Sequence, residues 1–175
     1  MWSSLVLAAL AQEAPPLVDP AAGTAAFLDV VQVLQSPRCM NCHPVGDAPL
    51  QGDLSRPHAM SITRHSPEVG LPCSTCHRVV GLPLPGVPPA NPSWHLPPAN
   101  QVFQGRTPAA LCAQLKDPAQ TGGRDLPALL AHVRDDALVR WGWSPGGRTV
   151  PPGSHEAFVA AFATWIDAGA PCPPP

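Results

Sequence analysis

The chain has 175 residues, of which 45% are hydrophobic and 13% are charged, and its formal net charge is −2. This length is typical of one ordinary domain, and a charge near zero without a block of basic residues argues against a nucleic-acid partner. The 26 prolines and 14 glycines, with only 5% aromatic residues and no tyrosine, argue against long strands and long uninterrupted helices.

The chain begins with a short apolar stretch, residues 1–11, that ends in Ala9-Leu10-Ala11. This small-x-small pattern is typical of a secretory cleavage site, so we expect a signal peptide over residues 1–11 and export to the periplasm. The alternative is an ordinary apolar N-terminus, because the stretch is short and no Lys or Arg precedes it. No later stretch reaches the ~18–20 continuous apolar residues of a membrane span, so none is expected.

Residues 12–23 contain three prolines and are predicted to form a flexible linker. Residues 24–175 are expected to form a single, mainly α-helical and loop-rich domain with about four short helices. The first helix is predicted to begin at Thr24, a suitable N-cap, because the apolar residues that follow recur at helical spacing: Phe27, Val31 and Leu34. It is predicted to end at Ser36-Pro37, directly before a pair of cysteines.

Two pentapeptides of the form Cys-x-x-Cys-His occur at residues 39–43 and 73–77. In such a motif the two thiols add across the two vinyl groups of a haem, and the histidine binds the iron from one side. We therefore expect two covalently bound haem c groups, held by Cys39, Cys42 and His43, and by Cys73, Cys76 and His77. The alternatives are a zinc site, which needs two cysteine pairs around one metal, and a thioredoxin-like redox pair, which needs a βαβ context.

Each motif is followed by a further histidine on a predicted loop. His58 lies in residues 44–72, which carry scattered Gly and Pro, and His95 lies in the Pro-rich stretch 81–98. A Pro-rich loop has little conformational freedom to lose, so it presents a side chain to an iron at low entropic cost. Both histidines are therefore candidate distal ligands.

The predicted ligation is bis-histidine at both irons. We expect His43 to pair with His58 and His77 to pair with His95, although the two distal residues could be exchanged between the haems. Met60 is the alternative to His58, because methionine is also a haem ligand and gives a higher reduction potential. A solvent-facing role for either loop histidine also remains open.

Three more helices are predicted after residue 98. The first begins at Thr107-Pro108 and ends before Asp117-Pro118, and the second begins at Asp125. The third covers about residues 154–168 and ends at Gly169. Each carries a one-sided apolar stripe that is expected to face the core: Leu111 and Leu115; Leu126, Leu129, Leu130 and Val133; and Phe158, Phe162 and Trp165.

The two remaining cysteines, Cys112 and Cys172, are followed by no histidine and are not expected to attach haem. In an oxidising compartment they could form a disulfide that ties the C-terminal tail to the helix around residue 112, which is the arrangement we favour. The alternative is a buried free cysteine at 112 and a mobile one at 172.

From Cys39 to Pro173 the chain resembles a family of small proteins known as isoquinoline 1-oxidoreductase subunits. The resemblance rests on both Cys-x-x-Cys-His motifs and on short runs around them. These runs are Pro44, Gln51-Gly52-Asp53, Pro57-His58, Met60, Trp94-His95-Leu96, Leu111-Cys112, Gln114-Leu115-Lys116-Asp117-Pro118, Gly122-Gly123-Arg124, Leu138-Val139, Trp141-Gly142-Trp143, Trp165-Ile166 and Gly169-Ala170.

That family name belongs to molybdenum hydroxylases, which carry molybdopterin and plant-type [2Fe–2S] clusters. The chain is too short for the first and lacks the Cys-x4-Cys-x2-Cys spacing of the second. The resemblance therefore implies a haem-bearing companion that takes electrons from such a hydroxylase, and it does not imply isoquinoline as a substrate.

The expected function is that of a periplasmic di-haem c-type cytochrome, which transfers electrons to or from a redox protein partner and is not itself an enzyme. The alternatives are a di-haem peroxidase-like enzyme and a haem-based sensor module. A peroxidase of this kind resembles two joined cytochrome domains, at roughly 100–150 residues each, and the chain is shorter than two such domains together.

Overall fold

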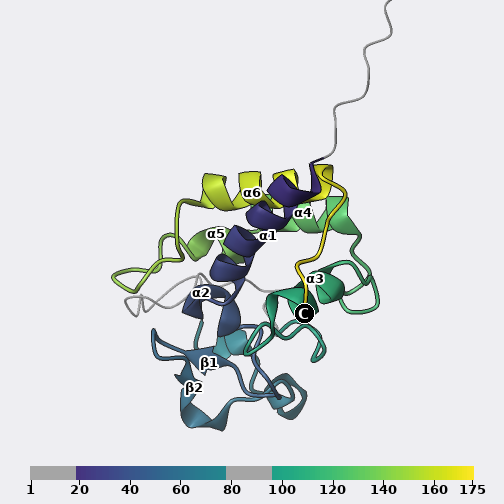
Figure 1. Cartoon of the computed structure of the whole chain (residues 1–175). Coiled ribbons are helices and arrows are strands. Elements are labelled where there is room, and N and C mark those ends of the chain that lie inside the picture. Colours follow the sequence, from purple (N-terminus) through teal and green to yellow (C-terminus); the bar gives the residue numbers. More distant parts are fainter. Residues whose placement is uncertain (1–18, 78–95) are drawn as a thin grey trace, which may run out of the picture.

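The computed structural model describes residues 19–77 and 96–175 (Figure 1). Over these residues the protein is mainly helical with very little sheet, as the sequence predicts. The α-helices are α1 (Pro20–Leu34), α2 (Pro37–Met40), α3 (Pro108–Leu115), α4 (Leu126–Asp135), α5 (Ala137–Trp141) and α6 (His155–Asp167). The strands are β1 (Leu50–Gln51) and β2 (Arg56–Pro57), and the 3₁₀ helices are η1 (Ala59–Ser61), η2 (Ser66–Val69) and η3 (Cys73–Thr75).

The first helix begins earlier than predicted. The side chain of Asp19 accepts hydrogen bonds from two backbone N–H groups of the first turn (2.9 and 3.2 Å), so the helix begins at Pro20. Thr24 is not the N-cap, because its hydroxyl donates to the Pro20 carbonyl (2.8 Å) inside the helix. The expected linker covered residues 12–23, and its last residues, from Pro20 on, are helical. The expected signal peptide lies outside the described residues.

The three later helices begin where the sequence predicts. The side chains of Thr107, Asp125 and Ser154 each accept a hydrogen bond from a backbone N–H of the first turn (3.2, 2.9 and 3.1 Å). The short helix α5 was not predicted. It begins because the carboxylate of Asp136 accepts hydrogen bonds from two backbone N–H groups directly after α4 (2.8 and 3.4 Å).

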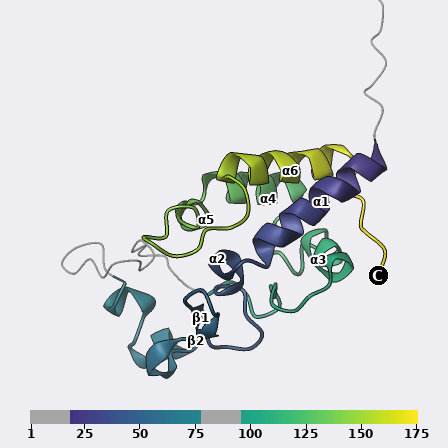
Figure 2. The same ribbon diagram turned by 60° about the vertical axis from the view of Figure 1, so that its left-hand side comes forward.

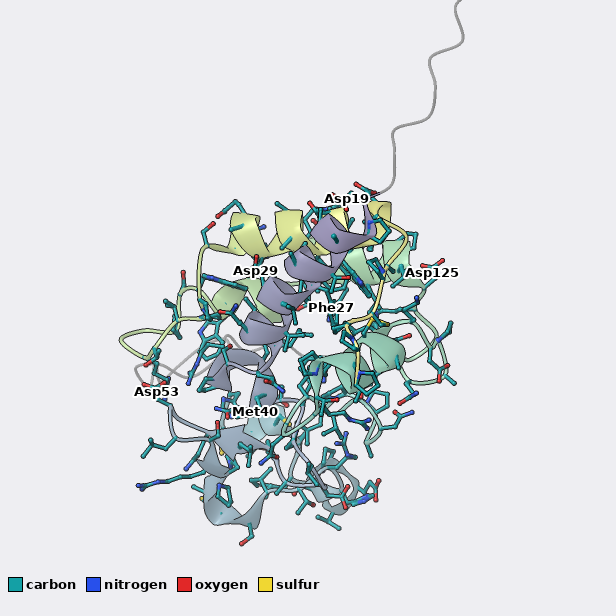
Figure 3. The ribbon with its side chains drawn as sticks, in the orientation of Figure 1. Asp19, Phe27, Asp29, Met40, Asp53 and Asp125 are labelled. Atoms are coloured by element: carbon teal, nitrogen blue, oxygen red, sulfur yellow. A yellow bond between two sulfur atoms is a disulfide. The ribbon has the colours of Figure 1, made fainter. Side chains whose placement is uncertain are left out.

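The core lies where α1 crosses α6, with α4 against the other side of α6 (Figures 1 and 2). Phe27 on α1 points into this core (Figure 3), and its ring centroid lies 4.7 Å from that of Trp165. Gly23 marks the closest approach, since a Cβ placed there would lie 2.4 Å from the Cβ of Ala168. The three predicted stripes contribute to the core through Leu111, Leu115, Leu129, Val133, Phe158, Phe162 and Trp165.

A disulfide joins the C-terminal tail to α3. Cys112 and Cys172 are bonded, with Cα atoms 5.5 Å apart, which confirms the favoured arrangement. The tail turns back at Gly169, whose φ of +82° is readily adopted only by glycine. The indole N–H of Trp165 then donates to the Pro171 carbonyl (3.0 Å), so both a covalent bond and a hydrogen bond hold the tail on the core.

The segment with β1 and β2 lies at the opposite end of the molecule from α6 in both views, and α2 lies between it and α1 (Figures 1 and 2). The two strands form an antiparallel pair, in which Leu50 lies opposite Pro57 and Gln51 opposite Arg56. We call residues 44–77 the loop region, because they carry only these two short strands and the three 3₁₀ helices. Among the residues with described structure, no helix is both long and apolar enough to cross a membrane.

Candidate functional site

The first Cys-x-x-Cys-His motif forms one continuous helical turn. It starts in α2, and the backbone N–H of His43 donates to the carbonyl of Cys39 (3.2 Å), four residues back. The N–H of Cys42 donates to the same carbonyl (3.2 Å). In a helical turn, residues three and four positions apart share a face, so both thiols and the imidazole belong to one side of the turn.

The second motif repeats this backbone geometry in a different setting. It starts in η3, and the N–H of His77 donates to the carbonyl of Cys73 (2.9 Å) while the N–H of Cys76 donates to it at 3.2 Å. Cys76 is exposed, and Cys73 and His77 are half-buried. The second motif therefore has one exposed thiol, that of Cys76, whereas no residue of the first motif's Cys-Cys-His set is exposed.

The thiols of the first motif have raised pKa values. Burial raises the pKa of Cys39 to about 12 and that of Cys42 to about 11. The thiols of the first motif are therefore protonated at neutral pH. A thioredoxin-like pair needs a thiol with a lowered pKa, and the first motif has the opposite.

All four motif cysteines are free thiols. They are Cys39, Cys42, Cys73 and Cys76. The other two cysteines of the chain are already joined to each other, so the disulfide and the motifs are chemically distinct sets.

The imidazole of His43 is held in one orientation by two contacts. Its Nδ1 lies 2.9 Å from the carbonyl oxygen of Gln101, and because a carbonyl only accepts, Nδ1 carries the proton and Nε2 keeps its lone pair. Its ring stacks on Phe103, with centroids 3.8 Å apart and planes 10° apart. Burial lowers the pKa of His43 to about 4, so the ring is neutral, which is the form that binds metals.

His58 is positioned by the β1–β2 hairpin. It directly follows β2, and its backbone N–H donates to the carbonyl of Pro49 (2.9 Å), which extends the strand pairing by one residue. Its Nδ1 lies 2.8 Å from the Ala59 carbonyl, so this ring also has its proton on Nδ1 and its lone pair on Nε2. The ring centroids of His58 and His77 are 6.1 Å apart, with an angle of 65° between the planes.

The structure thus places His58 beside His77, whereas the first-named pairing was with His43; which histidine binds which iron stays a prediction. His95, the expected partner of His77, lies outside the described residues. Met60, the alternative to His58, has an 81% exposed side chain. Its φ of +62° belongs to the left-handed region, which is uncommon for methionine.

The other described histidines have different partners. His65 lies 3.2 Å from the carboxylate of Glu68, and His155 Nε2 lies 2.8 Å from the carbonyl of Val133. His132 is near enough to His43 for its charge to lower the pKa of that ring, and it also lies 3.5 Å from the carboxylate of Asp136.

Arg38 and Asn41 attach the first motif to the hairpin. The buried guanidinium of Arg38 donates to the carboxylate of Asp53 (2.7 Å) and to the carbonyl of Gly52 (3.0 Å). The side-chain amide of Asn41 donates to the same Gly52 carbonyl (2.9 Å), and its backbone carbonyl accepts from Leu50 N–H (2.9 Å). Neither residue was predicted to matter. The signal in the sequence that could have pointed to Asn41 was a polar residue in the spacer of the motif.

Exposed apolar side chains are concentrated in the loop region. Seven large hydrophobic side chains are exposed in the described parts of the chain, and five of them lie between residues 45 and 71. These five are Val45, Leu54, Met60, Val69 and Leu71. A haem is a large flat apolar group, and covering such side chains removes their surface from water, so the residues present fit this group.

No three His, Cys, Asp or Glu side chains in the described ranges gather into a set that could by itself hold a metal ion. A haem site has no need of such a set, because the porphyrin supplies four of the iron ligands and the protein only one or two.

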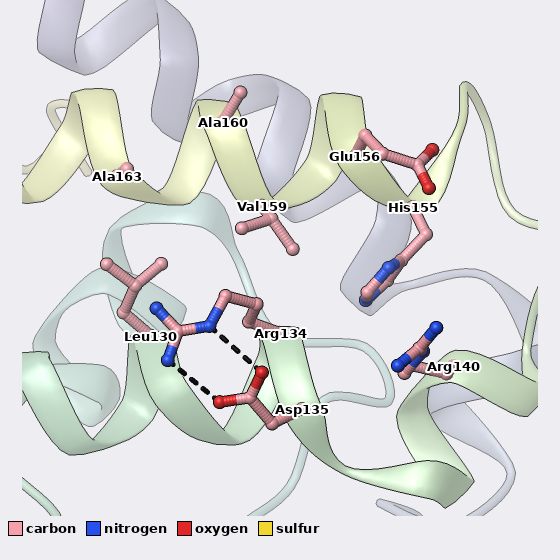
Figure 4. A pocket seen from close by; sticks show the side chains of 9 residues that line it. All are labelled: Leu130, Arg134, Asp135, Arg140, His155, Glu156, Val159, Ala160 and Ala163. Carbon is pink, nitrogen blue, oxygen red and sulfur yellow. Dashed lines mark hydrogen bonds and ion pairs between the residues drawn. The ribbon is translucent and has the colours of Figure 1, made fainter.

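Two hollows lie elsewhere on the described surface. One of about 530 Å³ lies between α4, α5 and α6, where Leu130 and Val159 face the ion pair of Arg134 and Asp135 (2.8 Å; Figure 4). The other, of about 420 Å³, lies between the hairpin and Arg148. Neither is lined by a residue of the two motifs.

No protein-family model, no curated protein and no solved structure matches this chain.

Proposed function

We propose that the protein is a di-haem c-type cytochrome that transfers electrons. The observation that carries this proposal is the repeated turn in which His43 and His77 each donate a backbone hydrogen bond to the first cysteine of their own motif. Each turn gathers two free thiols and an imidazole on one side, which are the groups that covalent haem attachment uses.

In this proposal the thiols of Cys39, Cys42, Cys73 and Cys76 form the thioethers, and the two motif histidines bind the irons. When bound, each haem supplies an iron that takes up and releases one electron at a time. The chain holds the imidazole of His43 ready for this role, since the Gln101 carbonyl keeps the proton on Nδ1 and Phe103 supports the ring.

The closeness of the two motifs supports a carrier with two neighbouring haems. The hairpin links the two motifs, since it is hydrogen-bonded to Asn41 of the first motif and its neighbour His58 lies beside His77 of the second. An electron would then pass between the two haems without a large movement of the chain.

The proposed compartment is the periplasm. The bond between Cys112 and Cys172 supports an oxidising environment, where such bonds persist, and the pattern at residues 1–11 supports export. The proposed partner is a redox protein, and the family resemblance favours a molybdenum hydroxylase as the electron donor. A carrier of this kind passes electrons on and performs no bond chemistry of its own.

An optical spectrum tests carrier against enzyme and sensor. We expect protein made with a cytochrome c maturation system to show two six-coordinate, low-spin haems that dithionite reduces fully and that bind no carbon monoxide. A high-spin haem in the wild-type protein that binds carbon monoxide would favour the sensor, and one that reacts rapidly with hydrogen peroxide would favour the peroxidase. Either result would overturn the proposal of a simple carrier.

A further inference from the structure

The rings of His58 and His77 lie near each other, although His58 is in the middle of the loop region and His77 is its last residue. Their ring centroids lie 6.1 Å apart, too far for ring stacking at van der Waals contact, and the planes are inclined by 65°. His58 comes from the end of the β1–β2 hairpin, and His77 closes the second motif. The two rings are therefore brought together by the fold and not by closeness in sequence.

The spacing of the two rings fits one metal ion between them. Bonds from a metal ion to imidazole are about 2 Å long, and the bonded nitrogen lies about 1 Å from the ring centroid. Two imidazoles on opposite sides of one iron thus have centroids about 6 Å apart. The angle between the planes is no obstacle, because each ring can turn about its own bond to the iron.

The protonation of His58 also fits. Its Nδ1 donates to the Ala59 carbonyl (2.8 Å), which leaves the lone pair on Nε2, as the Gln101 carbonyl does for His43. Its position is fixed by the backbone bond to Pro49, so the ring is presented by paired strands and not by a free loop.

We propose that His58 and His77 are the two axial ligands of one and the same iron, that of the haem attached at Cys73 and Cys76. The inference rests on the proposed function, because it needs a haem at the second motif. It has a structural consequence. The hairpin that carries His58 is attached to the first motif through Asn41, so the first motif positions the distal ligand of the second haem.

The ordinary alternative is a simple contact between two imidazoles, with His58 having no bond to iron. The test compares wild type with His58→Ala. The matched control is His65→Ala, because His65 lies in the same region, has a 63% exposed side chain and pairs with Glu68. Intact mass counts the covalent haems, and electron paramagnetic resonance reports the spin state of each.

We expect His58→Ala to keep two covalent haems and to lose about half of the low-spin signal, with one haem becoming high-spin and binding carbon monoxide. Added imidazole should restore the low-spin state, and His65→Ala should match wild type. If His58→Ala leaves both haems low-spin, the inference is wrong although the protein is still a di-haem cytochrome. If wild type carries no covalent haem, the proposed function fails instead.

A second pair of variants identifies the haem. Cys73→Ala leaves one vinyl group on the second haem, which shifts the visible bands of that haem to longer wavelength and marks it. If the second haem is retained, the marked haem should become high-spin in Cys73→Ala/His58→Ala. If Cys73→Ala loses the second haem altogether, the spin state of the remaining haem should be the same with and without His58→Ala. A response of the unmarked or remaining haem would assign His58 to His43 and overturn the inference.

Discussion

The guanidinium of Arg38 and the carboxylate of Asp53 form an ion pair, 2.7 Å apart, that joins the residue before the first motif to the hairpin. The side chain of Arg38 is only 2% exposed, whereas that of Asp53 is 41% exposed. Asp53 also accepts hydrogen bonds from the backbone N–H (3.2 Å) and the hydroxyl (3.1 Å) of Thr149. One carboxylate thus connects three segments of the chain that are far apart in sequence.

The first prediction concerns the pH dependence of this contact. Hydrogen bonds from Thr149, and after them the charge of Arg38, hold the pKa of Asp53 below its usual value of 3.8. A carboxyl with a lowered folded pKa stabilises the protein above its unfolded pKa and loses that effect as the pH falls through the folded pKa. Asp53→Asn should therefore lower the thermal unfolding midpoint at pH 7, and the difference from wild type should shrink below about pH 4.

Asp135→Asn is the matched control, because it removes the carboxylate of another Arg–Asp ion pair, that of Arg134 and Asp135. Arg134 and Asp135 are 55% and 62% exposed, and such pairs contribute little because water screens them. This variant should keep the wild-type midpoint at pH 7. An Asp53→Asn midpoint equal to that of wild type at pH 7 would show that Asp53 is not an anchor of the hairpin.

The second prediction concerns the disulfide. Cys112 and Cys172 are separated by 60 residues, and in the chain-entropy model closing such a loop stabilises the folded state by ~4 kcal/mol. We expect Cys112→Ala/Cys172→Ala to lower the free energy of unfolding in urea by about 2–4 kcal/mol. Reductant should shift the wild-type curve toward that of the variant and leave the variant unchanged. Rapid alkylation of both cysteines without reductant would show that the bond is absent.

The third prediction concerns the contact between α1 and the end of α6. On an exposed helical surface, Gly→Ala usually stabilises by roughly 0.5–1 kcal/mol. At Gly23 a Cβ would lie 2.4 Å from the Cβ of Ala168 and 2.9 Å from the ring of Pro171, so the packing must open. We expect Gly23→Ala to lower the free energy of unfolding by about 1–2 kcal/mol, so the sign of the effect is the test. A stabilised variant would mean that these helices are not in close contact.

The fourth prediction concerns the spacer of the first motif. Asn41 holds the hairpin through its amide bond to the Gly52 carbonyl (2.9 Å), and the hairpin carries His58. Asn41→Ala should still attach two haems, because the cysteine spacing is unchanged, but it should increase the high-spin fraction of the second haem. Ser74→Ala is the control, since Ser74 is an exposed spacer residue of the second motif. If the two variants have equal spectra, Asn41 does not position His58.

Much of the helical part of the fold could be predicted from the sequence because its signals are local. Thr107 and Asp125 cap helices with their own side chains, and the stripes at helical spacing face the core. The start of α1 was misplaced because Asp19 is as good a cap as Thr24 and precedes a proline. The short α5 was not predictable because five residues are too few to show the helical spacing of apolar residues.

The relations within the candidate site were less predictable. The motifs are visible because porphyrin chemistry dictates their spacing, whereas the meeting of His58 and His77 depends on two strands of two residues each. Such strands carry no alternation that a sequence pattern could reveal. Asn41 acts through a backbone carbonyl of the hairpin, and a carbonyl partner leaves no mark on residue type. Arg38 also pairs with Asp53, but nothing in the sequence says which of the 12 acidic residues lies beside it.

Each Cys-x-x-Cys-His turn is proposed to carry a covalent haem, and the intact mass of the denatured protein counts the haems attached. The chain should be produced with a functioning cytochrome c maturation system, treated with acid and acetone, and compared with Cys39→Ser/Cys42→Ser and Cys73→Ser/Cys76→Ser. Thioether bonds survive this treatment, so the account predicts two haems on wild type and one on each double variant. Wild-type protein that carries no covalent haem under these conditions would contradict the account.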